Sequence, residues 1–142
     1  MKLKIKPITQ QFNLEYDVEG QSTVTIRQVK AGDLVRLGDL FAEQTQIWDD
    51  EDLGAIQLKR KWNAEELKQE RAYCSLVGLD LTVEETGEPW FKFKEGRNGP
   101  ELAMTRAEFI ERWGLLDAEL ANEIYGYVVR VNPVFDPNAS GE

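Results

Sequence analysis

The stretch that decides the fold runs from residue 104 to residue 136 and reads MTRAEFIERWGLLDAELANEIYGYVVRVNPVFD. Thr105 and Glu108 have the spacing of a capping box, in which each side chain bonds a free backbone N–H at a helix start. Gly114 favours the end of that helix. The pattern therefore predicts a helix from Thr105 to Gly114, and its predicted buried face consists of Phe109, Ile110 and Trp113.

A second helix is predicted to begin at Asp117. It should end at Asn132-Pro133, because the residue before a proline is pushed out of helical geometry. One face of this helix carries apolar residues at helical spacing, namely Leu120, Ile124, Tyr127, Val128 and Val131. Ala121 and Tyr125 make that face broader. The sequence therefore ends in two consecutive amphipathic helices.

These two helices carry more bulky apolar side chains than two short helices need. We therefore expect a surface for another protein, since large aromatic and aliphatic anchors dominate protein interfaces. Phe135 follows the helix stop and is buried only if the chain folds back onto the domain or a partner covers it. The residues predicted to bind the partner are Trp113, Leu120, Ile124, Tyr125, Tyr127 and Phe135.

The first thirty residues are predicted to form antiparallel strands. Apolar residues alternate with lysines over residues 2–8, as in a half-buried strand, although Pro7 makes this strand short or places it at an edge. Residues 12–18 repeat the alternation, and residues 23–29 resume it with β-branched side chains. The turn between these last two runs is predicted near Gly20.

The middle of the chain is predicted to hold two helices separated by an acidic loop. The first begins with Asp33 as N-cap and presents residues 34, 37, 41 and 48 on one face. Residues 49–52 are consecutive carboxylates without the alternating ligands of a calcium loop, so we interpret them as a solvated loop. Residues 53–62 fit a strand or a helix. Asn63, with Glu66 three positions on, predicts the start of a second, polar helix.

A hairpin is predicted between this polar helix and the C-terminal pair. Residues 79–83 and 90–93 have strand-like patterns on either side of a turn-rich segment, residues 84–89. Residues 96–100, GRNGP, predict a loop that no regular element crosses.

The predicted fold class is therefore α+β, with N-terminal antiparallel strands, a central hairpin, and helices in the middle and at the C-terminus. Residues 1–135 are expected to form a single domain, and residues 136–142 a flexible C-terminal tail.

Composition excludes several classes of function. The 17 basic and 26 acidic residues give a net charge of −9, which disfavours binding to nucleic acid. The chain contains no histidine, the usual general base and metal ligand, and its one cysteine, Cys74, has no imidazole to activate it. Phosphate-binding glycine loops are also missing. We therefore expect no catalytic residues, no metal, no cofactor, no small-molecule ligand and no enzymatic activity.

The sequence also bears on location. Residues 1–12 lack the continuous apolar run of a signal peptide, and no window approaches the ~18 apolar residues of a membrane span. We expect a soluble protein from a reducing compartment, without a membrane partner.

The second half of the chain, residues 79–135, resembles the tail assembly chaperones of long-tailed bacteriophages and related prophage tail proteins. The resemblance rests on Gly87-Glu88-Pro89 followed by aromatics, on Thr105-Arg106-Ala107-Glu108-Phe109, and on a helix closing at Val131-Asn132-Pro133. One departure is Val134 where a second aromatic would directly follow the proline; Phe135 lies one place on.

The resemblance implies a non-enzymatic protein in the cytoplasm of the bacterial host. It implies two partners, the tape-measure protein, which such chaperones coat, and the tail-tube protein, which displaces them as the tube polymerises. A longer form made by frameshifting near the C-terminus is common in that family. A homo-oligomer also remains open.

Two alternatives remain. A structural virion protein of the tail or of the head–tail connector would share the acidic, histidine-free α+β character. An acidic inhibitor that mimics DNA would need carboxylates clustered at phosphate-like spacing, and the basic triplet Lys59-Arg60-Lys61 argues mildly against it.

Overall fold

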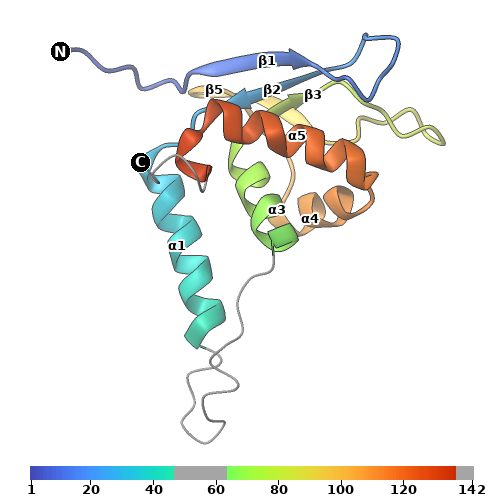
Figure 1. Cartoon of the computed structure of the whole chain (residues 1–142). Coiled ribbons are helices and arrows are strands. Elements are labelled where there is room, and N and C mark those ends of the chain that lie inside the picture. The colour runs from blue at the N-terminus through green and yellow to red at the C-terminus, as the bar shows by residue number, and fades with distance from the viewer. Residues whose placement is uncertain (47–63, 137–142) are drawn as a thin grey trace, which may run out of the picture.

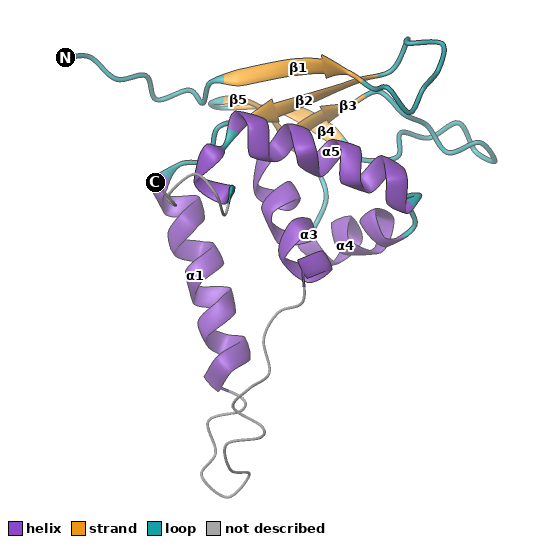
Figure 2. Cartoon of the chain, viewed as in Figure 1, coloured by secondary structure: helices purple, strands orange, loops and turns teal. Residues whose placement is uncertain are grey.

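A computed structural model describes residues 1–46 and 64–136 of the chain. It confirms the α+β class: an antiparallel sheet forms one layer, and helices α3, α4 and α5 lie on one side of it (Figures 1 and 2). Helix α1 leads away from these helices (Figure 1). Predictions for Trp48, residues 49–52, residues 53–62, Asn63 and residues 137–142 fall outside the described residues.

The sheet has three strands in the order β1-β2-β3, and both pairs are antiparallel. The strands are β1 (Thr9–Asn13), β2 (Thr23–Arg27) and β3 (Leu76–Leu79). The turn near Gly20 is confirmed, and Gly20 has φ +70°, a conformation in which glycine avoids the clash of a Cβ. The turn and the second strand of the first antiparallel pair therefore form where the sequence predicts them, whereas the first strand lies earlier, at Thr9–Asn13.

The strand predicted over residues 2–8 is wrong. These residues precede β1 and pair with no strand, and Leu3, Ile5 and Ile8 are exposed. Residues 12–18 are not one strand either, because β1 ends at Asn13 and a turn follows. Alternation alone predicts a strand, but a strand forms only where a neighbouring strand supplies its hydrogen bonds.

The predicted central hairpin is present as a turn with one bridge, between Thr82 and Pro89, flanked by a 2.8 Å hydrogen bond from the Trp90 N–H to the Leu81 carbonyl. The regular hairpin is formed by β4 (Phe93–Gly96) and β5 (Gly99–Leu102). The loop predicted over residues 96–100 is therefore corrected to a tight two-residue turn, which Gly99 makes accessible with φ +112°.

The helices confirm most predicted boundaries. They are α1 (Ala31–Gln46), α3 (Ala64–Ser75), α4 (Arg106–Gly114) and α5 (Ala118–Val131), followed by a 3-10 turn, η1 (Pro133–Phe135). Both hydrogen bonds of the Thr105–Glu108 capping box are present. Asp117 is the N-cap of α5, but its side chain makes no capping hydrogen bond. Asp33 lies inside the first turn of α1, which corrects its predicted place as N-cap.

The core lies between the sheet and the helices. The buried face of α5 packs against the inner face of β2, and the aromatic rings of α4 pack beneath it. Phe109 stacks on Phe91 with ring centres 4.8 Å apart and on Trp113 at 5.9 Å. Burial of these rings stabilises the fold, because aromatic side chains remove large apolar surfaces from water.

Candidate protein-interaction surfaces

The structure places most of the predicted partner-binding residues inside the domain. Trp113, Leu120, Ile124 and Phe135 are at most 6% exposed and belong to the core. The prediction that they form an outer surface is therefore corrected. The sheet and α3, distant in sequence from α4 and α5, cover the apolar surplus that the two helices display.

The remaining two predicted residues, Tyr125 and Tyr127, are half-buried and hold elements together. Arg71 of α3 donates a 2.8 Å hydrogen bond to the Tyr125 hydroxyl. Tyr127 stacks on Phe12 of β1 at 4.4 Å and donates a 2.7 Å hydrogen bond to Glu123. Burial, together with the Glu123 carboxylate, raises the pKa of Tyr127 to about 12. Both tyrosines therefore serve the packing of α5.

Phe135 is buried because the chain folds back after α5. The 3-10 turn η1 directs its ring beneath the guanidinium of Arg71, whose central carbon lies 4.7 Å from the ring centre. This is a cation–π arrangement. The sequence is compatible with burial of Phe135 either by the domain or by a partner. In the structure, the domain itself covers the ring.

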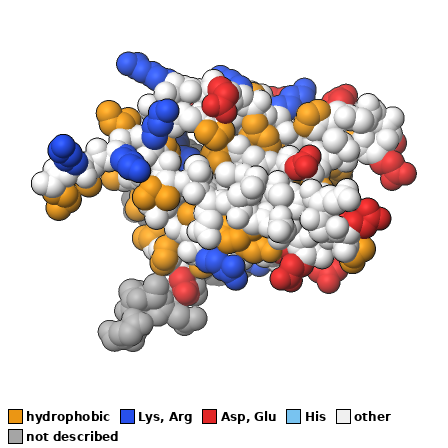
Figure 3. All heavy atoms as spheres, turned by 90° about the horizontal axis from the view of Figure 1, so that it is seen from above, with side chains coloured by type: hydrophobic (Ala, Val, Ile, Leu, Met, Phe, Trp, Pro, Cys, Tyr) orange, Lys and Arg blue, Asp and Glu red, His pale blue; other side chains and the backbone are white. Residues whose placement is uncertain are grey.

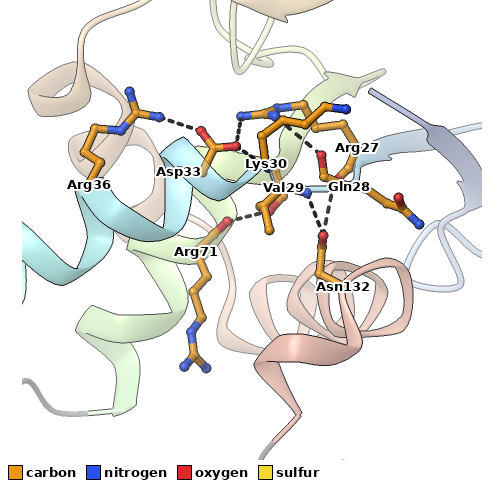
Figure 4. A network of polar contacts seen from close by, with 9 residues as sticks. Arg27, Gln28, Val29, Lys30, Asp33, Arg36, Arg71 and Asn132 are labelled. Carbon is orange, nitrogen blue, oxygen red and sulfur yellow. Dashed lines mark hydrogen bonds and ion pairs between the residues drawn. The ribbon is translucent and has the colours of Figure 1, made fainter. Parts of the chain in front are cut away.

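Asn132 ends α5, as the sequence predicts, and its side chain also connects α5 to two other segments. It is 3% exposed, and its side chain accepts a 2.8 Å hydrogen bond from the Val29 N–H. Its amide donates to the Arg27 carbonyl at 3.0 Å and to the Val128 carbonyl at 3.2 Å. Figure 4 shows this side chain reaching from the end of α5 to the segment between β2 and α1. One side chain thus ties the C-terminal helix to the end of β2 and to the segment that leads into α1.

Asp33 forms a second polar cluster on the other side of that segment (Figure 4). It is 6% exposed and accepts hydrogen bonds from Arg27 at 3.0 Å, from Arg36 at 2.6 Å and from the Lys30 N–H at 2.8 Å. Burial by itself acts to raise the pKa of the Asp33 carboxyl, but other interactions lower it more. The Arg27 hydrogen bond, the Lys30 N–H and the two guanidinium charges outweigh burial and hold the pKa below its usual value. The cluster anchors the first turn of α1.

Beside this anchor, α1 exposes apolar side chains. Leu34 is 39% exposed and Val35 is 63% exposed, whereas Leu37 is half-buried against the core. We call Leu34, Val35 and Leu37 the α1 surface. A cavity of about 410 Å³ lies next to the first turn of α1, bounded by the N-terminal segment and the tip of the β4–β5 hairpin. This end of the molecule, and not α5, presents unburied apolar groups on a helix.

Features that would support chemistry are sparse in the described part of the chain. Cys74 is buried, and burial raises the pKa of its thiol to about 11, so the thiol stays protonated near neutral pH. Among residues 1–46 and 64–136, no group of three or more acidic or sulfur side chains is placed to hold a metal ion. Within the same ranges, no helix combines the length and apolar character needed to cross a bilayer.

Comparison of the chain with protein-family models, with curated proteins and with solved structures found no match.

Proposed function

We propose that this protein is a non-enzymatic tail assembly chaperone of a long-tailed bacteriophage or prophage, which binds the tape-measure protein before the tail tube polymerises. The resemblance of residues 79–135 to that family suggests the partner. The observation that carries the proposal is the α1 surface, where Leu34 and Val35 stay exposed while the apolar faces of α4 and α5 are covered. The binding surface is therefore assigned to α1 and not to α5.

The chemistry of the α1 surface suits a helical partner. Aliphatic side chains on an exposed helix pack against the apolar stripe of another amphipathic helix. Two or three such side chains bury little area, so each contact is weak and tail-tube subunits can displace it. A long helical partner offers many repeats of the stripe, and many copies can then bind side by side.

The acidic character of the chain fits the same role. The net charge of −9 repels phosphate backbones and keeps the chaperone away from phage DNA in the cytoplasm of the host, where assembly would occur. The proposal requires no cofactor, metal or catalytic residue.

The proposal is tested by co-expressing the chain with the tape-measure protein of the same genome, then capturing the complex and measuring its mass. We expect many copies on one tape-measure chain. The variant Val35→Glu should weaken binding about tenfold or more, because it places a charge in an apolar contact. Val18→Glu is the matched control, since Val18 is 94% exposed and lies in the turn between β1 and β2, outside α1. The control should bind like the parent chain.

Two results would contradict the proposal. Equal losses for Val35→Glu and Val18→Glu would remove α1 from the binding surface. No association with the tape-measure protein, together with closed rings of the free chain that persist on dilution and in high salt, would favour a structural tail or connector protein.

A further inference from the structure

The two ends of the molecule differ in charge. Seen from above, Lys and Arg side chains gather mainly toward the end that carries the N-terminus, and Asp and Glu mainly toward the opposite end (Figure 3). The N-terminal segment carries Lys2, Lys4 and Lys6, and the cavity beside it is lined by Arg27, Lys30 and Arg36. Asp33 neutralises part of that charge through Arg27 and Arg36, but the lysines of the N-terminal segment remain exposed.

The N-terminal segment, residues 1–8, combines those lysines with uncovered apolar side chains. Leu3 is 86% exposed and lies between Lys2 and Lys4. The segment is joined to the domain by a 2.8 Å hydrogen bond from the Gln28 N–H to the Ile8 carbonyl and by a 3.4 Å one from Lys30 Nζ to the Lys4 carbonyl. Its own domain therefore does not bury Leu3.

The opposite end holds an apolar pocket of about 190 Å³. It lies where the predicted central hairpin meets the junction of α4 and α5, and it is lined by Leu81, Thr82, Trp90, Leu115, Leu116, Asp117 and Leu120. Leu120 is buried, whereas Leu115 is 63% exposed at the rim. The pocket is thus open to solvent, and its largely apolar lining suits an aliphatic side chain.

One carboxylate lines this pocket, and others lie close to its lining residues in the sequence. Asp117 lines it, and Tyr16 donates a hydrogen bond to Asp117. Glu119 follows in the first turn of α5 and acts electrostatically on Tyr16, and the exposed Asp80 directly precedes the lining residue Leu81. The nearby cation Arg112 lies 5.8 Å from the centre of the Trp90 ring and pairs with Glu88 at 4.0 Å. The pocket therefore favours an apolar residue flanked by positive charges.

We infer that Leu3 of one copy occupies this pocket on a second copy, with Lys2 and Lys4 facing the carboxylates around it. The sequence Lys2-Leu3-Lys4 has the alternation that the pocket and its rim require. The N-terminus and the α4–α5 junction lie at opposite ends of the molecule (Figure 1), so the site is filled by another copy and not by the same chain. The contact is heterologous, and repeating it produces a head-to-tail row of copies.

This contact is weak by itself. A segment of a few residues buries less than the roughly 800 Å² per partner of a stable protein interface. Attraction between exposed charges also falls as salt rises. Copies aligned on one long partner would strengthen the contact through their high local concentration. The inference goes beyond the proposed function and holds for the isolated chain.

The test is sedimentation velocity of the full chain, free of any added N-terminal residues, over a range of concentrations at low and at high salt. We expect the average mass to rise with concentration at low salt and much less at high salt. Leu3→Asp and Leu115→Asp should each abolish this rise. Val134→Asp adds the same charge at an exposed valine outside both surfaces and should leave the rise unchanged.

A mixing experiment separates a head-to-tail contact from other modes of association. Leu3→Asp retains an intact pocket and Leu115→Asp retains an intact N-terminal segment, so an equimolar mixture should form dimers and nothing larger. A parent chain that stays monomeric at every concentration would overturn the inference, as would an unchanged mass rise in Leu3→Asp or a mixture that stays monomeric. None of these sedimentation measurements uses the tape-measure protein. A negative result would therefore overturn the self-association and leave the proposed function untouched.

Discussion

Helices α5 and α1 are both amphipathic, yet α5 buries its apolar face whereas the first turns of α1 leave apolar side chains exposed. On α5, Ile124 and Val128 are fully buried beneath the sheet, and Asn132 ties the end of the helix to the segment after β2. On α1, Val35 is 63% exposed and Leu34 is 39% exposed. An amphipathic sequence therefore has different consequences in the two helices: α5 contributes its apolar face to the core, whereas α1 leaves Leu34 and Val35 exposed near its start.

The difference follows from what lies beside each helix. Strands β1 and β2 pass over α5, whereas α1 leads away from the other helices after its first turn (Figure 1). Hydrophobic periodicity shows that a helix has an apolar side, but the neighbouring elements decide whether that side meets the same chain. Four predictions make this comparison measurable.

The largest effect is expected from truncation of the buried face of α5. Ile124→Ala should lower the free energy of unfolding by about 2–5 kcal/mol, because it removes buried methyl groups and leaves a cavity. Leu34→Ala on α1 should cost less than about 1 kcal/mol, since this side chain keeps much of its contact with water. Urea unfolding of both variants measures the contrast. Similar losses at the two sites would contradict it.

Asn132→Ala should come next. It leaves the Val29 N–H and the Arg27 carbonyl without their side-chain partners, at a cost of about 2–3 kcal/mol in the free energy of unfolding. Asn122→Ala is the control, because Asn122 is exposed on α5 and only accepts a hydrogen bond from Lys68; it should cost about 0.5 kcal/mol or less. Thermal unfolding of the two variants measures this difference in stability. Equal losses would show that the Asn132 side chain adds no more stability than an exposed asparagine on the same helix.

The anchor of α1 should show a smaller, pH-dependent effect. The folded state lowers the pKa of Asp33 below its ordinary 3.8, so its stabilising contribution is present above that pH and is lost as pH falls through the folded pKa. Asp33→Asn should therefore cost about 1–2 kcal/mol at neutral pH, and the difference from the parent chain should vanish in acid. Unfolding measured from neutral pH into acid tests this. A difference independent of pH would assign the effect to shape and not to charge.

The smallest effect on stability is expected from Val35→Glu. Because Val35 is largely exposed, the free energy of unfolding should change by no more than about 0.5 kcal/mol. The same variant is expected to lose tape-measure binding, so stability and binding separate at this position. A large loss of stability would show that the α1 surface is part of the core.

Features that depend on a few neighbouring residues could be predicted from the sequence. The capping box of Thr105 and Glu108 forms as expected, and α5 ends at Asn132-Pro133. The turn at Gly20 joins the first two strands. Each of these features rests on hydrogen bonds or steric limits within a few residues, which the local sequence specifies.

Features that need a distant partner were predicted less well. Residues 2–8 have the alternation of a strand but pair with no strand, and the predicted loop at residues 96–100 is the turn of a regular hairpin. Strand β3 was missed because the four residues Leu76–Leu79 have no polar alternation; they are central to the fold through pairing with β2, some fifty residues earlier. The candidate surface moved from α5 to α1 for a related reason, since exposure depends on the whole fold.

The sequence by itself determined the α+β class, the starts and stops of the C-terminal helices, and the apolar row on α5. Only the tertiary structure decided that Ile124 and Phe135 are covered, that Val35 and Leu3 are not, and that Asn132 bonds to Val29, 103 residues away. The physical reason is the separation along the chain over which each interaction acts. Helix caps and proline stops act over three or four residues, whereas burial is created by segments that meet only when the chain has folded.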